Sequence, residues 1–248
     1  IKVKAKKQFH KFYKTKKTLK NLEDFCLEKI WIGDLIYDSY LKKHSEITID
    51  IDSENFKVFF LETLNLFYFW KDIFKIHDIK GVIVCHSVYI SGIPLRIANH
   101  NKILSFYFNG ANFYNITNRI SYKNRINGTD ISFRYYKKVF NRFNKRKKQK
   151  CLLEGRRYLK SITEGNNKYY YIKNLSFSKK NNFKFLPNDK SKIVIYPHLF
   201  NDSIHTYGNH FFPDYFKWLE FLKLVIKKTN YDWYIKRHPD EDIYTKKI

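Results

Sequence analysis

The stretch KGVIVCHSVYISGIPLRIANHNKILSFYFN, Lys80–Asn109, is the most informative part of the sequence for the fold. Val82–Cys85 is a short run of apolar, mostly β-branched residues, which predicts a strand buried on both faces. A helix is expected near Pro94–His100, and a second strand at Ile103–Phe108. A strand, a helix and a strand in this order predict a βαβ unit and therefore a parallel sheet.

A second stretch repeats this order near the end of the chain. The run KIVIYPH, Lys192–His198, predicts a strand, and the apolar spacing of Pro213–Lys228 predicts a helix. WYIKRHP, Trp233–Pro239, predicts the strand that follows. The sequence therefore predicts an α/β fold with two Rossmann-type parallel-sheet domains, residues 1–185 and 186–248.

The second domain is expected to be truncated. Its last predicted strand ends close to Ile248, the chain begins with Ile, and it contains no Met. We therefore expect the chain to be a fragment in which residues 186–248 form only the start of a domain.

The first domain contains two further predicted helices. IWIGDLIYDSYLKK, Ile30–Lys43, predicts a strand, a turn and a helix that begins near Leu35, with Asp34 as its N-cap. A long helix is expected from Glu54 to Phe74. Its apolar part is interrupted by polar residues, which favours a core helix over a membrane span.

The composition indicates a folded, strongly basic protein. Of 248 residues, 44% are hydrophobic and 19% aromatic, which is enough for a substantial core and excludes global disorder. The formal net charge is +25, with a dense basic block at NRFNKRKKQK, Asn141–Lys150. This charge favours nucleic acid, an acidic membrane surface or phosphorylated substrates as partners. A lysine-rich composition that decorates the whole surface explains it equally well, and both interpretations stay open.

The cysteines indicate a reducing compartment. Cys26, Cys85 and Cys151 lie far apart and lack the CxxC spacing of metal and redox sites. Neither a disulfide framework nor a zinc site is expected, and a cytoplasmic location fits best.

Polar residues follow both predicted strands of the second half. Ligands of open parallel sheets bind at the carboxyl ends of the strands. KRHP supplies Lys236, Arg237, His238 and Pro239 after the last strand. The two basic side chains are suited to neutralising phosphate, and the imidazole to donating a hydrogen bond to it. The alternative is a charged surface turn.

The other strand leads into YPHLFNDSIHTYGNHFF, which contributes His198, Asp202, His205 and His210. We expect these residues to contact a sugar or nucleotide. His and Asp are competent zinc ligands, but their spacing matches no compact metal motif, so no metal is predicted. Asp202 is equally suited to closing a turn.

The first half offers carboxylates at a strand-to-helix turn. Asp34 and Asp38 are one helical turn apart and therefore lie on one face, where one of them could act as a general base. The alternative is an N-cap and a solvated Asp. His86, Tyr89 and Arg96 follow the Val82 strand and either line the same cleft or are ordinary loop residues.

Common nucleotide and hydrolase motifs are missing from the sequence. It contains no GxGxxG, Walker or GxSxG pattern, which removes the usual support for dinucleotide oxidoreductases, P-loop enzymes and α/β-hydrolases.

Four stretches together resemble a known family. They are IGDLIYDSYL (32–41), VCHSVYISGIPLRIA (84–98), PHLFNDSIHTYGNHFFPDYFKWL (197–219) and WYIKRHPDED (233–242). Jointly they are similar to bacterial surface-carbohydrate biosynthesis proteins, which are related to capsular polysaccharide synthesis proteins and Kdo transferases. The resemblance covers most of the chain and is weakest at residues 1–20 and 110–190.

The resemblance implies a GT-B glycosyltransferase that works without a cofactor. Residues 1–185 would form the acceptor-side domain, and residues 186–248 would begin the nucleotide-sugar-binding domain. His238 and Pro239 match a motif that contacts the donor phosphate, often of a CMP-sugar. Asp34 and Asp38 match acidic positions on the acceptor side. Here Arg237 stands where the family often has Pro, and the later Gly-Thr and Glu-containing segment of the donor pocket is absent.

Three functions are carried forward from the sequence. The first is transfer of a sugar from a nucleotide-activated donor to a membrane-associated glycan acceptor, by a cytoplasmic enzyme that lies peripherally on anionic membrane. The second is a CDP-polyol phosphotransferase on the same fold. The third is a basic, non-enzymatic nucleic-acid-binding protein, which the lack of an RRM, KH or helix-turn-helix pattern disfavours.

Overall fold

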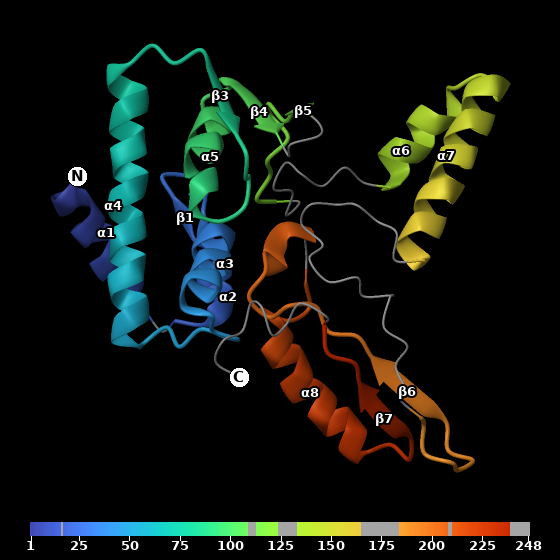
Figure 1. Cartoon of the computed structure of the whole chain (residues 1–248). Coiled ribbons are helices and arrows are strands. Elements are labelled where there is room, and N and C mark those ends of the chain that lie inside the picture. The colour runs from blue at the N-terminus through green and yellow to red at the C-terminus, as the bar shows by residue number, and fades with distance from the viewer. Residues whose placement is uncertain (16, 109–112, 124–132, 165–183, 208–209, 239–248) are drawn as a thin grey trace. The chain divides into compact units, whose positions relative to one another are not determined.

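A computed structural model describes residues 1–15, 17–108, 113–123, 133–164, 184–207 and 210–238 (Figure 1). These residues form two compact units. One comprises residues 1–123 and 198–228, and the other comprises residues 133–197 and 229–238. The first unit is therefore discontinuous in sequence, because residues 198–228 return to it. This division differs from the single boundary expected between residues 185 and 186.

The first unit is a mixed α/β structure with a helical core. Its elements in chain order are α1 Lys2–Tyr13, α2 Leu19–Glu23, β1 Cys26–Leu27, β2 Ile30–Trp31, α3 Gly33–His44, α4 Glu54–Ile76, β3 Gly81–Val84, η1 Ile90–Gly92, α5 Ile93–His100, β4 Leu104–Phe108, β5 Phe113–Asn115, η2 Ile204–Tyr207 and α8 Tyr215–Lys227.

The long helix α4 lies beside α1 and forms one wall of the core (Figure 1). Phe56, Phe60 and Phe67 of α4 are fully buried. Phe12 of α1 packs on Phe60, with ring centroids 4.8 Å apart. The expected core helix is confirmed, and the N-terminal lead-in contributes a packed helix to the same core.

A tight hairpin precedes α3. The strands β1 and β2 pair antiparallel and are joined by Glu28 and Lys29, whose φ angles of 50° and 67° are those of a two-residue type I′ turn. The helix α3 then begins at Gly33. A Cβ at this position would lie 2.1 Å from the carbonyl oxygen of Leu22, so only glycine allows this close approach.

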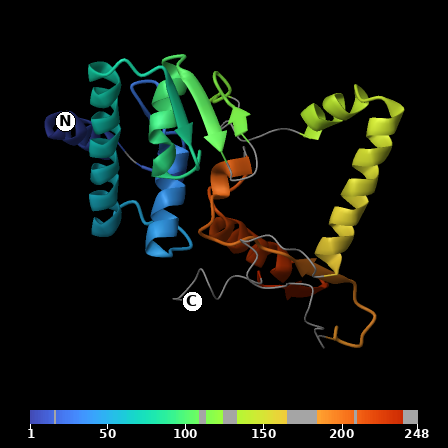
Figure 2. The same cartoon turned by 45° about the horizontal axis from the view of Figure 1, so that its top comes forward.

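The predicted βαβ unit of the first half is confirmed. The strands β3 and β4 pair in parallel, β5 adds antiparallel to β4, and α5 packs against both parallel strands (Figure 2). The expectation that the first strand is buried on both faces is wrong. Ile83 is 65% exposed, because α5 covers only the face that carries Val82 and Val84.

The second unit contains α6 Phe133–Asn141, α7 Lys145–Thr163, β6 Lys192–Ile195 and β7 Asp232–Ile235. The two strands pair in parallel, and α8 lies between them in the chain. The strand–helix–strand order predicted for the second half is therefore confirmed. The helix starts at Tyr215 with Asp214 as its N-cap, two residues later than expected from Pro213.

The described residues therefore have a mixed α/β fold in which each parallel pair belongs to a small sheet, of three strands in the first unit and two in the second. None of the described helices combines the length and the apolar character needed to cross a bilayer.

Candidate functional site

Helix α3 carries two buried carboxylates. Gly33 to Leu41 are buried without interruption, so both faces of this part of the helix contact protein. Asp34 and Asp38 are each only 3% exposed. Their expected position on one helical face is confirmed by the four-residue spacing within α3. The alternatives of an N-cap and a solvated Asp are wrong: the N-cap is Ile32, and Asp34 is in the first turn.

Asp34 forms a buried ion pair with Arg96 of α5. Arg96 Nη2 donates to Asp34 Oδ2 at 2.5 Å, and Nη1 donates to the carbonyl of Trp31 at 3.1 Å. Burial raises the pKa of Asp34 above its usual value, and the charge and hydrogen bond of Arg96 oppose this shift. The guanidinium also lies over the Trp31 ring, 4.7 Å from its centroid. Arg96 is therefore fixed from three sides.

Asp38 contacts His205, which lies in the segment 198–228 that returns to the first unit (the returning segment). The Nδ1 of His205 lies 2.6 Å from Asp38 Oδ1, and the His205 backbone N–H donates to Oδ2 at 3.2 Å. Burial by itself would lower the pKa of His205, but the charge and hydrogen bond of Asp38 raise it above its usual value. A carboxylate bonded to Nδ1 fixes the ring orientation and leaves Nε2 as the nitrogen available for proton transfer.

His210 lies next to this pair. Its ring centroid is 6.3 Å from that of His205. Burial and the neighbouring positive charge of His205 lower the pKa of His210. The Nε2 atoms of both histidines are buried and have no hydrogen-bond partner among the described residues. The site thus pairs a histidine that favours the charged form with one that favours the neutral form.

Asp202 joins the returning segment to the C-terminal end of α3. Its Oδ1 accepts from Lys42 Nζ at 3.2 Å and from the Tyr89 hydroxyl at 2.8 Å. Burial favours the neutral acid, but the hydrogen bond from Tyr89 and the charge of Lys42 outweigh it and lower the pKa of Asp202. The positive charge of His198 acts in the same direction. Three predicted site residues, Tyr89, His198 and Asp202, therefore interact here. Asp202 attaches its segment of the chain to α3 through Lys42.

Asp214 makes a third contact between the returning segment and α3, and the sequence analysis missed it. Its Oδ2 accepts from the Tyr37 hydroxyl at 2.5 Å and from Thr48 Oγ1 at 2.6 Å. Its Oδ1 accepts from the backbone N–H of Lys217 at 2.7 Å and caps α8. An Asp directly before an apolar helical pattern is an N-cap signal, so this role could have been found from the sequence.

The other predicted site residues belong to other segments of the chain. His86 is exposed in the loop after β3. Lys236, Arg237 and His238 belong to the second unit and follow β7, where the backbone N–H of Lys236 extends the pairing by donating to Ile195 at 2.9 Å. Pro239 lies outside the described residues. The expected position of these cations beyond the end of a parallel strand is confirmed.

The described residues contain no group of three or more His, Cys, Asp or Glu arranged to hold a metal ion. Comparison with protein-family models, with curated proteins and with solved structures finds no match to this chain. The chemistry therefore has to be argued from the site itself. The cluster offers one arrangement suited to catalysis, the carboxylate-oriented imidazole of His205.

Proposed function

We propose that this chain belongs to a glycosyltransferase that builds surface polysaccharide from a nucleotide-activated sugar. The observation that carries the proposal is the Asp38–His205 pair, a buried carboxylate bonded to the Nδ1 of an imidazole. In this proposal the imidazole deprotonates a sugar hydroxyl once the acceptor reaches its buried Nε2. The four stretches that resemble surface-carbohydrate biosynthesis proteins support the same reaction, and both residues lie within them. A GT-B arrangement of two Rossmann-like domains is part of the proposal.

The proposed reaction transfers the sugar from the nucleotide to an acceptor hydroxyl. His205 Nε2 takes the proton of the acceptor hydroxyl, whose oxygen forms a bond to the anomeric carbon of the donor. The bond between that carbon and the donor phosphate breaks, and the nucleotide leaves with its negative charge. Lys236, Arg237 and His238 offset this charge by hydrogen bonds to the phosphate. Pro239 would fix the turn that presents them.

The carboxylates act indirectly in this proposal. Asp38 orients the imidazole and stabilises its protonated form, as a buried acid does in other acid–histidine pairs. Asp34 forms an ion pair with Arg96 and so links α3 to α5. The sequence analysis assigned the general base to Asp34 or Asp38. Here we assign it to His205, because each carboxylate already accepts a hydrogen bond from a charged or polar donor.

A membrane-associated acceptor fits the character of α7. This helix carries eight Lys or Arg residues and one Glu. One side of it gathers Cys151, Leu152, Tyr158, Leu159 and Ile162 at helical spacing. Leu152 and Leu159 are 53% and 61% exposed, and no residue of the helix is buried. A basic helix with an exposed apolar side is typical of helices that lie in the surface of anionic bilayers.

The test is a donor survey with the full chain. Purified protein is titrated with CMP-, CDP- and UDP-linked sugars and with a CDP-polyol, and release of free nucleotide is followed in the presence of a lipid-linked glycan. Release from a nucleotide-sugar, abolished in His205→Asn but kept in the exposed control His86→Asn, supports the proposal. Release from the CDP-polyol alone supports the phosphotransferase instead. Binding to RNA or DNA that falls steeply with salt, without nucleotide release, would overturn both.

A further inference from the structure

A second site lies on the solvent side of Arg96. A pocket of about 250 Å³ opens between β2, the C-terminal end of α5 and the segment after β5. It is lined among others by Lys29, Trp31, Arg96, His100, Lys102 and Tyr122. All of these residues belong to the first unit.

The charged residues that line this pocket are all basic. Lys29, Arg96 and Lys102 are cationic and His100 is protonatable, whereas none of the lining residues carries a carboxylate. Lys29 and Lys102 are exposed and form no ion pair with a carboxylate among the described residues. Because Asp34 neutralises the charge of Arg96, the positive potential of the pocket comes from the two lysines.

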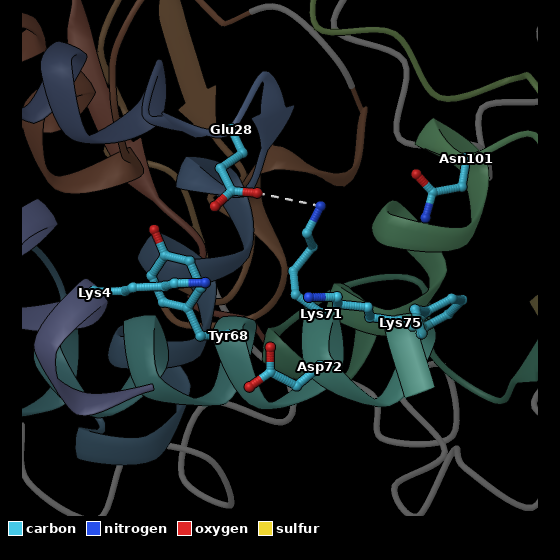
Figure 3. Close-up of a pocket in the computed structure, with 8 residues that line it drawn as sticks. Lys4, Glu28, Tyr68, Lys71, Asp72, Lys75 and Asn101 are labelled. Carbon is cyan, nitrogen blue, oxygen red and sulfur yellow. Dashed lines mark ion pairs between the residues drawn. The ribbon is translucent and has the colours of Figure 1, made fainter. Parts of the chain in front are cut away.

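The neighbouring pocket shows that lysines alone do not make such a site (Figure 3). It is lined by Lys4, Lys71 and Lys75, but also by Glu28 and Asp72. Lys71 Nζ already pairs with Glu28 at 3.2 Å. An anion entering there would compete with carboxylates that are part of the wall, and no such competition exists beside Lys29 and Lys102.

The pocket against Arg96 is also preorganised. Arg96 is fixed by Asp34, by the Trp31 carbonyl and by the Trp31 ring, and its side chain is only 1% exposed. Its Nε is buried and has no hydrogen-bond partner among the described residues. A buried donor without a partner costs free energy that a bound acceptor would recover. A fixed guanidinium favours planar recognition of a carboxylate or phosphate.

The backbone places both lysines in an unfavourable conformation. Lys29 has a φ of 67° in the type I′ turn, and Lys102 has a φ of 59° directly after α5. The backbone N–H of Ile103 donates to Ala98 at 2.9 Å across this helix end, a pattern that usually places Gly at the left-handed position. A lysine at such a position is less favourable than glycine, because its Cβ is crowded by the backbone. Both lysines nevertheless line the pocket.

The remaining wall of the pocket is aromatic, which is suited to contact with a sugar ring. The rings of Trp31 and Tyr122 meet edge to face, with centroids 5.9 Å apart, and Tyr122 as a residue is 43% exposed. Asn118 adds an amide at the rim. Small-molecule sites commonly combine an aromatic surface with a few charged or polar groups that fix the orientation.

We propose that this pocket binds a sugar that carries a carboxylate or a phosphate, with the anion between Lys29, Lys102 and Arg96 and the ring against Tyr122. The proposal does not rest on the glycosyltransferase activity, because it concerns binding to the first unit alone. Failure of one therefore leaves the other standing.

Calorimetric titration of the full chain tests the proposal with four probes: glucuronate, glucose 6-phosphate, inorganic phosphate and neutral glucose. We expect saturable binding of at least one of the charged sugars, and weaker binding of phosphate and glucose. Lys29→Gln and Lys102→Gln are each expected to raise the Kd about tenfold or more, because each removes one charge-assisted hydrogen bond to the anion. Lys75→Gln in the neighbouring pocket removes the same charge and leaves the Kd unchanged.

Two outcomes would overturn the proposal. If inorganic phosphate binds as tightly as both charged sugars, the pocket recognises charge alone and the ring has no role. If Lys75→Gln weakens binding as much as Lys102→Gln, the sugars respond to the overall basic charge and not to this pocket. Neither lysine is buried, so all three variants are expected to fold, which circular dichroism checks.

Discussion

His205 Nδ1 lies 2.6 Å from Asp38 Oδ1, although the two residues are 167 positions apart in the chain. Both side chains are almost fully buried, at 2% and 3% exposure. Together with the Lys42–Asp202 and Tyr37–Asp214 contacts, this pair attaches three residues from the C-terminal part of the chain to three positions of α3. The same contacts that prepare the imidazole for catalysis therefore also complete the first unit.

The first prediction concerns the stability that this pair confers. His205→Gln leaves the Asp38 carboxylate buried without its charged partner, and we expect the free energy of unfolding to fall by about 3–5 kcal/mol. His86→Gln, at an exposed position, is the matched control and should change it by no more than about 0.5 kcal/mol. Urea denaturation followed by circular dichroism measures both. Equal effects of the two substitutions would show that the buried pair contributes nothing.

The second prediction concerns pH. The folded-state pKa of His205 lies above its usual value of 6.5, so the protonated imidazole contributes stability that is fully present below pH 6.5 and lost as the pH rises through the folded-state pKa. The carboxylates of Asp38, Glu23 and Asp34 favour this charge. The lowered pKa of His210 acts oppositely, because its neutral form is favoured by folding and stability is lost as the pH falls below 6.5.

Comparing the wild type with His205→Gln at each pH measures the contribution of His205 together with its effect on His210, whose pKa the His205 charge lowers. We expect the difference in free energy of unfolding to be largest near pH 6 and to decline at alkaline pH. Urea titrations between about pH 5.5 and 9 measure it, within the range where imidazoles titrate. A difference that grows towards alkaline pH would contradict the raised pKa.

The third prediction uses two glycines in helices. Gly33→Ala forces a Cβ to within 2.1 Å of the Leu22 carbonyl oxygen, so α3 has to shift and the first unit should lose several kcal/mol, about 2–4. Gly155→Ala in α7 meets nothing within 4 Å and should stabilise that helix by up to about 1 kcal/mol. Thermal unfolding distinguishes them. A tolerated alanine at position 33 would show that α2 and α3 are not packed as closely as described.

Local sequence patterns were enough to predict most elements of the fold. The apolar runs that became β3, β4, β6 and β7 are short and continuous, and the apolar stripe of α4 is long and periodic, so neighbouring residues alone determine them. The exposure of Ile83 could not be predicted in this way. Whether a second layer covers a strand depends on distant parts of the chain.

The site illustrates the same limit. Asp34, Asp38, Arg96 and His205 were all predicted as site residues, because polar groups after strands and at helix starts are recognisable in sequence. Their pairing was not predicted, since Arg96 is 62 positions from Asp34, and His205 was assigned to a different domain from Asp38. Sequence position suggested that residues 198–228 stay with β6 and β7, whereas their ion pairs and hydrogen bonds hold them to α3.

The fourth prediction separates the two roles of Asp214. Asp214→Ala removes the cap of α8 and leaves the buried Tyr37 hydroxyl without its acceptor. We expect a loss of about 2–4 kcal/mol, the sum of a cap and a buried hydrogen bond. Ser53→Ala removes the cap of α4 and an exposed hydrogen bond from Ser53 Oγ to the Asp50 carbonyl, and should cost about 1 kcal/mol. Denaturant titration compares the two, and equal losses would contradict a role of Asp214 beyond capping.

The fifth prediction tests the proposed membrane contact of α7. Leu152 and Leu159 lie on the apolar side of the helix, whereas the equally exposed Leu153 lies on the basic side at this spacing. Burying a leucine in the interface contributes about 1 kcal/mol or more, so Leu152→Gln with Leu159→Gln should weaken binding to phosphatidylglycerol vesicles at least about tenfold. Leu153→Gln is the matched control and should leave binding nearly unchanged. Vesicle co-sedimentation measures all three chains, with phosphatidylcholine vesicles as the neutral comparison. Equal binding to both lipids, or an equal effect of Leu153→Gln, would show that the apolar side of α7 does not enter the bilayer surface.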